Sequence, residues 1–392
     1  MGFFFQAEDG IRDYDVMEFR RVLFRSPTAA EVEAFVLSSD PEAYSRAVDA
    51  LLGSPRFGER MASMWMTVAR YAEDQAHQVG NNAKFFYPHA HRYRQWVIDA
   101  FNRDLPYNEF VRLQLAADSE GEDDLEALGF LGLGPQYYNR GRLDVIAEEW
   151  EDRVDTVTRG FLGLTVACAR CHDHFYDPIT TKDYHALAGV FASSKMEKRK
   201  VGDREMHIVK DQKVRDLEIF IRGNVEDKGP KVPRGFLRIL SASGERETFT
   251  DGSGRRELAD AIVDPRNPLT ARVMVNRLWG EIFGAPLVAT ASNFGANGQK
   301  PTHPQLLDYL AVKFQEDEWS IKSLVRELVL SATYRQAVTR SEDNRLLAGM
   351  NRRRLSAEML RDSMLVADRK STRLNSSHVV NSYAVFCLKN KR

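Results

Sequence analysis

The chain has 392 residues, and its 55 basic and 56 acidic side chains give a formal net charge of −1. It contains no uninterrupted stretch of about 18 apolar residues, so the sequence predicts no transmembrane segment. Its 3 cysteines are too few for a disulfide framework or a four-cysteine zinc cluster, which excludes both classes.

The two ends differ in character from the rest of the chain. Residues 1–26 and 369–392 resemble translated sequencing-adapter read-through, as in Val22-Leu23-Phe24-Arg25-Ser26 and Lys370-Ser371-Thr372-Arg373-Leu374-Asn375. We interpret both ends as artefacts and the chain as an internal fragment. The first end carries 4 basic and 5 acidic side chains and the second 6 basic and none acidic, so residues 27–368 have a net charge of −6. Because nucleic-acid binding needs a concentrated basic face, we expect no nucleic-acid partner.

Apolar side chains recur at helical spacing between residues 28 and 118, which predicts a series of helices. The stripes are formed by Ala47, Val48, Leu51 and Leu52; by Met61, Met64, Trp65 and Val68; by Trp96, Val97 and Phe101; and by Phe110, Leu113 and Leu115. Residues 118–124 are acidic and are expected to form a solvated loop.

The clearest periodicity precedes a pair of cysteines. Apolar residues follow one another in steps of three and four along Ile146, Trp150, Val154, Val157, Phe161, Leu164, Cys168 and Cys171. This spacing predicts one face of a single long helix, with both thiols pointing inward. The acidic residues of this stretch are predicted to be its solvated face: Glu148, Glu149, Asp152 and Asp155.

The segment Cys168-Ala169-Arg170-Cys171-His172 has the attachment pattern of c-type haem. Two thiols three residues apart can form thioethers to the two vinyl groups of one porphyrin, and the next histidine can reach the iron. The remaining cysteine, Cys387, lies in the C-terminal end that we set aside. The alternative is that both cysteines are simply small buried apolar residues.

After the motif, Asp177-Pro178 is expected to interrupt the chain, and Thr180 with Asp183 predicts a capping box that opens a helix. Residues 207–209 and 217–221 predict two short strands around a polar turn, which together would form a hairpin. Residues 222–254 are rich in glycine, proline, serine and charge and are predicted to be a linker.

Helices are expected again from Arg255 and from Leu269, followed by one with Pro304 in its first turn and one capped by Ser320. The predicted fold is mainly α, with two helical modules joined by a linker that carries a short β-hairpin. The modules are residues 27–199 and 255–368, the second incomplete, and the linker is residues 200–254.

The sequence resembles a planctomycete-type family of large exported cytochrome c-like proteins. The first module matches through Gly163-Leu164-Thr165-Val166-Ala167-Cys168-Ala169-Arg170-Cys171-His172-Asp173-His174 and Asp177-Pro178-Ile179. The second module matches a companion domain through Asn267-Pro268-Leu269-Thr270-Ala271-Arg272-Val273-Met274-Val275-Asn276-Arg277-Leu278-Trp279, His303-Pro304 and Leu330-Ser331-Ala332-Thr333-Tyr334-Arg335. Both domains are of unknown function. The resemblance implies covalent haem c, electron transfer to an unidentified partner protein, and a periplasmic or extracellular location.

One departure from the family pattern concerns the distal side of the iron. Where the family tends to have Arg-His-Trp, this chain has Ser63-Met64-Trp65. Methionine is a common second ligand of histidine-ligated c-type iron, so Met64 is a candidate distal ligand. The alternative is a methionine that packs in the core.

In the haem hypothesis, Cys168 and Cys171 hold the porphyrin, His172 ligates the iron, and Asp173 and His174 orient the His172 ring. In a second hypothesis, Cys168, Cys171, His172 and His174 bind zinc. Four ligands within seven residues cannot easily surround one ion, so another histidine would have to replace one of these four ligands. The candidates are His77, His89 and His91.

A third hypothesis is a non-catalytic binding or scaffold protein in which the cysteine motif is structural. In the second module, Arg272, Asn276 and Arg277 could line a surface for a glycan or protein, or form only the wet face of a helix. Enzymatic activity is left open, since a five-coordinate iron would permit peroxide reduction.

Overall fold

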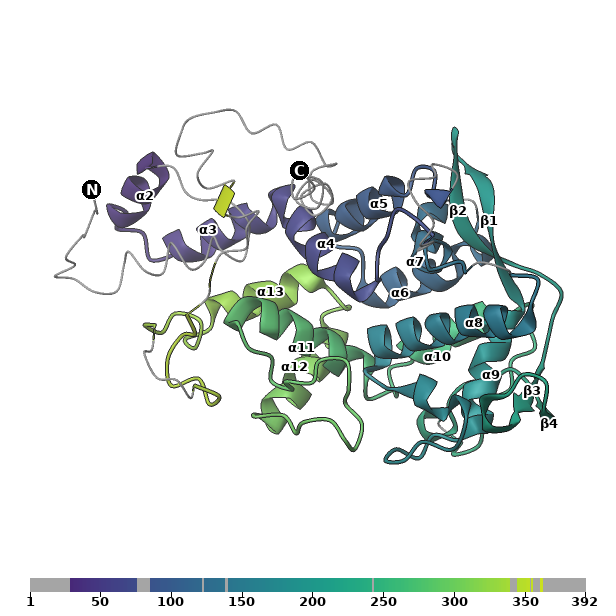
Figure 1. Cartoon of the computed structure of the whole chain (residues 1–392). Coiled ribbons are helices and arrows are strands. Elements are labelled where there is room, and N and C mark those ends of the chain that lie inside the picture. The colour runs from purple at the N-terminus through teal and green to yellow at the C-terminus, as the bar shows by residue number, and fades with distance from the viewer. Residues whose placement is uncertain are drawn as a thin grey trace, which may run out of the picture. The chain divides into compact units, whose positions relative to one another are not determined.

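The computed structural model describes residues 29–75, 85–121, 123–137, 140–241, 243–338, 344–352, 354 and 360–361. These residues are mainly helical, with two small antiparallel sheets near residues 194–232, which confirms the predicted fold class (Figure 1). None of the helices in the described ranges is long and apolar enough to cross a membrane.

The helices follow the predicted stripes closely. Their bounds are α2 Ala29–Val36, α3 Ala43–Leu52, α4 Arg56–Val68, α5 His91–Asn102, α6 Tyr107–Ala116, α7 Gly129–Gly132, α8 Leu143–Val157, α9 Thr181–Ala192, α10 Arg255–Val263, α11 Thr270–Phe283, α12 Pro304–Glu316 and α13 Ile321–Leu330. The predicted first-turn proline of α12 and the Ser320 cap of α13 are confirmed: Pro304 begins α12, and the Ser320 hydroxyl accepts a hydrogen bond from the Ser323 N–H at 3.0 Å.

The chain divides into two compact units whose limits differ from those of the predicted modules. The larger contains Met61–Glu281 and Ala285–Val325, and the smaller contains Met1–Arg60, Ile282–Gly284 and Arg326–Arg392. The predicted linker, residues 200–254, lies in the larger unit and includes the buried side chains Phe236, Leu237 and Phe249. The module boundaries read from the sequence stay a prediction.

In the smaller unit, α3 and the C-terminal part of α13 are joined by two polar contacts. The Tyr44 hydroxyl donates a hydrogen bond to the Val329 carbonyl oxygen at 2.9 Å, and Arg326 pairs with Asp49 at 2.7 Å. The Asp49–Arg326 pair is largely exposed, so it adds little stability.

The core of the larger unit is centred on Trp65 in α4, which is fully buried. Its ring lies 5.0 Å from that of Phe110 and 5.8 Å from that of Phe161, between ring centroids. Its indole N–H donates to Gln114 Oε1 at 2.8 Å, which satisfies the polar atom of the indole inside the core. Because Phe161 lies in the π-helical turn that leads toward the cysteine motif, this core supports the segment before the motif.

The predicted long helix is interrupted before the cysteines, so this expectation is wrong. Regular α8 ends at Val157, one π-helical turn covers Thr158–Leu162, and Gly163 then takes a left-handed conformation with φ of 60°. A left-handed glycine ends a helix because it turns the backbone away from the axis. The cysteines follow on a separate 3₁₀ turn, Val166–Arg170, and both are exposed rather than inward.

Both predicted strand segments are strands, but they do not pair with one another as predicted. β1 (Ser194–Val201) pairs with β2 (Arg204–Asp211), and β3 (Leu217–Phe220) pairs with β4 (Lys228–Val232), each antiparallel. The β1 segment is rich in lysine and arginine, so it lacks the alternating apolar signal of a half-buried strand. In the larger unit, β2 packs against α7 (Figure 1).

The capping box predicted at the start of α9 is confirmed. The Thr180 hydroxyl accepts from the Asp183 N–H at 3.2 Å, and the Asp183 carboxylate accepts from the Thr180 N–H at 2.8 Å. Inside the helix, buried His185 accepts the Phe220 N–H at Nε2, 2.9 Å away, and so joins α9 to β3. The helix that follows the motif is therefore held at its start and along its length.

Asp183 should make the stability of the larger unit depend on pH. Burial alone would raise the pKa of this carboxyl, but hydrogen bonds from Thr180 and Arg238 and the charge of Arg246 bring the pKa below its usual value. A lowered pKa contributes stability above the unfolded-state pKa of about 3.9, and this stability is lost as the pH falls through the folded-state pKa. We expect Asp183→Asn to reduce the free energy of unfolding by about 1 kcal/mol at pH 7, measured by urea denaturation.

The difference between wild type and Asp183→Asn should shrink as the pH is lowered below about 4. Asp308→Asn, a change of an exposed carboxylate, serves as the control. A difference that stays constant from pH 7 to pH 3 would show that the charge of Asp183 does not stabilise the fold.

Candidate functional site

The cysteine motif lies in the larger unit, between the π-helical turn that follows α8 and the start of α9. Cys168 and Cys171 are free and exposed, and His172 is exposed beside them. Cys171 Sγ lies against Gly223, whose φ is 78°, and a Cβ atom built at residue 223 would collide with this sulfur. Glycine at 223 therefore leaves room for the thiol of Cys171.

The His172 ring is oriented by the backbone of the next residue. Its Nδ1 lies 2.7 Å from the carbonyl oxygen of Asp173, which can only accept, so Nδ1 carries the hydrogen. The lone pair is then on Nε2, which is the atom free to ligate a metal. The prediction that Asp173 orients His172 thus has a structural basis in its carbonyl, whereas its carboxylate accepts from the Thr181 N–H at 2.8 Å.

His174, two residues later, faces inward, and its side chain is only 5% exposed. Its Nδ1 accepts from the Asp177 N–H at 2.9 Å, and its Nε2 lies 2.9 Å from the Thr165 hydroxyl oxygen. Because both ring nitrogens already have partners within the loop, His174 could ligate a metal only by giving up one of these hydrogen bonds. It serves to fold the loop back on itself.

Two large aromatic side chains lie exposed after the motif. Phe175 is 79% exposed and Tyr176 is 63% exposed. The Phe175 ring lies 4.4 Å from the His172 ring, between centroids. The exposed thiols and histidine therefore adjoin a patch of exposed apolar surface, which is unusual for residues of this size.

Residues of α11 and of the following loop hold both ends of the motif loop. Arg277 donates to the carbonyl oxygens of Gly160 and of Arg159, the latter at 2.8 Å. The Phe294 N–H donates to the Gly163 carbonyl oxygen at 2.7 Å, which fixes the turn that precedes the cysteines.

The other end of the loop is held at Asp177, whose side chain is 7% exposed. Its Oδ1 accepts from the Ala296 N–H at 2.6 Å. Gly295 is packed so closely that a Cβ atom there would collide with the Asp177 carboxylate. The motif loop is thus held near both ends, at Gly163 and at Asp177, by hydrogen bonds from residues more than 100 positions away in the sequence.

Two of the three residues predicted to lie on a binding surface or wet face are instead buried. Asn276 is fully buried and exchanges hydrogen bonds with the backbone of Val288, at 3.0 and 2.7 Å. Arg277 is 8% exposed, because its guanidinium caps the end of the π-helical turn. Only Arg272 reaches the surface, where it pairs with Asp308 at 2.7 Å.

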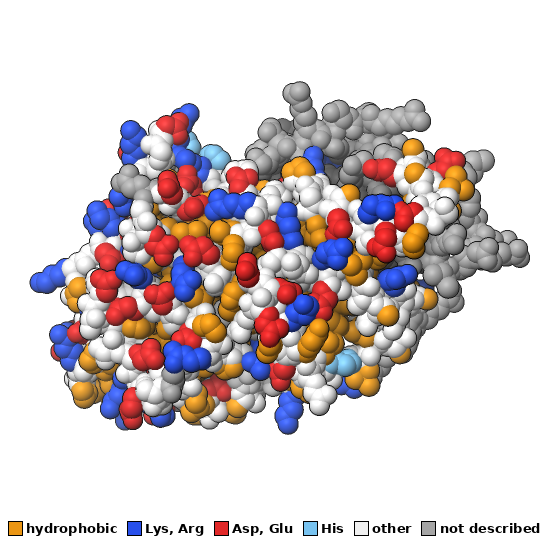
Figure 2. Space-filling model, turned by 180° about the vertical axis from the view of Figure 1, so that it is seen from behind, with side chains coloured by type: hydrophobic (Ala, Val, Ile, Leu, Met, Phe, Trp, Pro, Cys, Tyr) orange, Lys and Arg blue, Asp and Glu red, His pale blue; other side chains and the backbone are white. Residues whose placement is uncertain are grey.

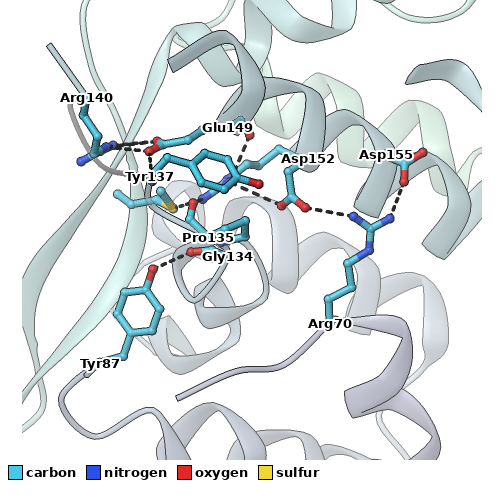
Figure 3. Close-up of polar contacts among 11 residues, drawn as sticks. Arg70, Tyr87, Gly134, Pro135, Tyr137, Arg140, Glu149, Asp152 and Asp155 are labelled. Carbon is cyan, nitrogen blue, oxygen red and sulfur yellow. Dashed lines mark hydrogen bonds and ion pairs between the residues drawn. The ribbon is translucent and has the colours of Figure 1, made fainter. Parts of the chain in front are cut away.

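The acidic face predicted for α8 is also partly wrong. Glu149 is 3% exposed and accepts from the Tyr137 N–H and from Arg140 Nε, both at 2.9 Å (Figure 3). Asp152 and Asp155 both pair with Arg70, which lies between them (Figure 3). Of the four acidic residues, only Glu148 is exposed.

In the part of the chain that the structure describes, no three His, Cys, Asp or Glu side chains are close enough together to hold a metal ion. The proposed zinc ligands Cys168, Cys171, His172 and His174 are therefore not brought together around one point. His89 and His91 lie 5.7 Å apart between ring centroids, and His77 lies outside the described residues.

Met64, the candidate distal ligand, is half-buried in α4 next to Trp65 in sequence.

On the face shown in Figure 2, acidic and basic side chains are interspersed, and no concentrated basic area occurs among the described residues drawn there.

The comparisons with protein families match both halves of the chain. Residues 18–196 match the family model of PSCyt2, protein of unknown function (DUF1549), and residues 254–385 match that of PSD1, protein of unknown function (DUF1553). The chain contains a PSCyt2 domain and a PSD1 domain, the planctomycete cytochrome-like pair of unknown function. Neither the curated proteins nor the solved structures contain a match to it.

The PSCyt2 match contains the cysteine motif, and the PSD1 match contains Arg277, Phe294 and Ala296. The contacts that hold the motif loop are therefore contacts between the two domains. The matches also include residues 18–26 and 369–385, parts of the ends that we interpret as read-through. Both ends lie outside the described residues, and their origin stays a prediction.

The PSD1 contact at Asp177 should keep the PSCyt2 motif loop ordered. Asp177→Ala removes the acceptor of the Ala296 N–H, and because Ala296 is exposed, water can replace this acceptor, so the expected cost is about 1 kcal/mol. We expect faster amide hydrogen exchange in residues 163–180 and 290–298, measured by mass spectrometry, together with a lower free energy of unfolding. Asp308→Ala is the control, and unchanged exchange in Asp177→Ala would contradict the assignment.

Proposed function

We propose that this protein is a c-type haem protein with a redox role. Cys168 and Cys171 would form the two thioethers, and His172 would ligate the iron through Nε2. The observation that carries the proposal is the state of these three residues: both thiols are free and exposed, and the adjacent His172 ring is oriented so that Nε2 has no partner among the described residues. This is the donor set that c-type haem uses.

The surroundings of the motif fit a large planar apolar group. Phe175 and Tyr176 add exposed aromatic surface, and the Phe175 ring lies beside His172. A porphyrin on this surface would cover apolar area that is otherwise in contact with water, which favours its binding.

Attachment requires no external oxidant or reductant. Each thiol adds across one vinyl group: a sulfur–carbon bond forms, the vinyl double bond is consumed, and the thiol hydrogen passes to the adjoining carbon. Once bound, the haem would supply one-electron transfer. The residues of this chain hold it, orient the proximal ring through the Asp173 carbonyl, and keep the loop between its two fixed ends.

A periplasmic or extracellular location belongs to the same proposal and rests on the resemblance to exported proteins. Fractionation of a host that expresses a full-length relative would test it, and haem-carrying protein confined to the cytoplasm would exclude it. The redox partner in this proposal is a second protein that exchanges electrons with the haem.

Covalent haem should be detectable by mass. Co-expressed with a cytochrome c maturation system, the chain should gain the mass of one haem that acid extraction does not remove. Cys168→Ser and Cys171→Ser should each leave at most one thioether, and the double variant should leave none. Wild-type protein that is colourless, with both thiols open to alkylation, would refute the proposal.

The axial ligand can be tested separately, because His172→Ala should retain the thioethers but change the visible spectrum. His91→Ala, a change of an exposed histidine that the zinc hypothesis uses as a possible ligand, should leave both haem and spectrum unchanged. Bound zinc instead of iron, lost in the His91 variant, would favour the metal-site hypothesis.

We propose Met64 as the distal ligand of the iron. Met64→Leu should then abolish the thioether–iron charge-transfer band at the red end of the absorption spectrum and lower the reduction potential, because methionine ligation raises it. Met66→Leu, at a half-buried position in the same helix, is the matched control. A band that survives in Met64→Leu would remove this residue from the ligand set.

A further inference from the structure

The turn between β3 and β4 lies against the cysteine motif, although it belongs to neither matched domain. Residues 221–227, which form this turn, lie between the ranges that match PSCyt2 and PSD1, residues 18–196 and 254–385. The backbone of Gly223 packs so closely on Cys171 Sγ that a Cβ atom at residue 223 would collide with this sulfur. One thiol of the candidate site is therefore in contact with a segment that neither family model describes.

Hydrogen bonds within the turn hold residue 223 at the sulfur. Arg222 and Gly223 both have a left-handed backbone, with φ of 52° and 78°. The Ile221 N–H donates to the Asp227 carbonyl oxygen at 2.9 Å, and the Asn224 N–H donates to the Ile221 carbonyl oxygen at 3.0 Å. These bonds close the turn, and glycine meets both of its demands at residue 223, a left-handed φ and no side chain.

Helix α9 holds both the turn and the motif, so the contact between them follows from the fold. β3 lies beside α9 (Figure 1), and His185 Nε2 of this helix accepts the Phe220 N–H at 2.9 Å, just before the turn. At the start of the same helix, the Thr181 N–H donates to the Asp173 carboxylate at 2.8 Å, just after the motif. Two segments that are distant in sequence are thus tied to one helix and meet at the thiol.

The conformation of the motif places both cysteines on the same side of the chain. A 3₁₀ helix has three residues per turn, so the side chains of residues i and i+3 lie one above the other. Cys168 belongs to the 3₁₀ turn Val166–Arg170, and Cys171 follows it with a helical backbone, φ −101° and ψ −28°. Two sulfurs on one side suit the two vinyl groups of one porphyrin.

We propose that Gly223 is a positioning residue of the haem site, which holds the Cys171 thiol in the orientation that attaches the second vinyl group. This inference rests on the proposed haem function and adds to it a residue outside the Cys-x-x-Cys-His segment. A side chain at residue 223 would occupy the position of the sulfur, so Cys171 would have to rotate about χ1 to another staggered rotamer. The sulfur would then leave the side that it shares with Cys168.

The first experiment measures the thiols in the absence of haem. The reduced full chain is alkylated with iodoacetamide, and the rate at each cysteine is determined from peptide masses. We expect Gly223→Ala to raise the rate of Cys171 relative to that of Cys168 by at least about threefold, because the displaced sulfur loses its contact with the turn. Gly229→Ala in the same hairpin is the matched control and should leave the ratio unchanged, since a Cβ atom there meets Ile219 at an ordinary distance of 3.5 Å.

The second experiment uses the full chain co-expressed with a cytochrome c maturation system. The wild type and Gly229→Ala should carry haem with two thioethers. Gly223→Ala should instead carry mainly haem that is joined at Cys168 alone, with one vinyl group unreacted. The α band of the ferrous pyridine complex shifts with each unreacted vinyl group, and iodoacetamide labels Cys171 where it is still free. A loss of stability alone would not leave haem attached at one cysteine and absent from the other.

Gly223→Asn keeps the test decisive if Gly223→Ala does not fold, because asparagine tolerates a left-handed backbone and still carries a Cβ atom. Gly202→Asn, at a φ of 60° in the β1–β2 turn, is the control for this change.

The inference would be overturned if both Gly223 variants had two thioethers and the wild-type alkylation ratio. Equal acceleration at both cysteines, or the same effect in a control variant, would overturn it too. A wild type without haem would remove the proposed function and this inference with it, whereas two thioethers in every variant would overturn this inference alone.

Discussion

The buried guanidinium of Arg277 is the contact on which the arrangement of the motif depends. The last carbonyl groups of a helix have no partners within the helix, and in a buried position they need donors from elsewhere. Here α8 ends in a π-helical turn whose Arg159 and Gly160 carbonyl oxygens accept from Arg277. Burial lowers the pKa of Arg277, and these hydrogen bonds offset the cost of placing its charge in the interior. The PSCyt2 helix that leads to the cysteines is thus completed by PSD1, which gives a physical reason for the two domains to occur in one chain.

In the motif loop after the π-helical turn, some side chains face the interior and others face water. Gly163 turns the backbone, the cysteines and His172 face water, His174 and Asp177 face inward, and the capping box of α9 ends the segment. The inward residues use their polar atoms within the protein: His174 binds Thr165 and the loop backbone, and Asp177 binds Ala296. The outward residues retain unused chemistry, namely two thiols and one imidazole nitrogen. The inward side chains therefore hold the loop in place, and the outward side chains of the same short segment are the ones available to react.

The sequence predicted the helices, the capping box and the motif well because these features depend on residues close together along the chain. It did not predict the interruption of α8, since the apolar steps continue through Cys168 and Cys171 although Gly160 and Gly163 lie between. Those glycines were the available signal for a helix end. Burial of Glu149, Asn276 and Arg277 could not be predicted in this way, because their partners are distant: Arg277 binds a carbonyl 117 positions earlier. Local patterns assign a polar residue to the surface unless its remote partner is known.

The geometry of the two histidines also separates the two cofactor hypotheses. A structural zinc site needs four donors that converge on one point, and its ligands are enclosed by the protein. Here His172 and His174 differ in exposure, and the second has no free ring nitrogen, so the four residues named by the zinc hypothesis do not converge. A c-type porphyrin needs a different set of groups: two thiols that react with its vinyl groups, one nitrogen that ligates the iron, and apolar side chains that cover the rest of its surface. Exposed thiols, one oriented imidazole and the adjoining ring of Phe175 are residues of the types that our haem proposal uses.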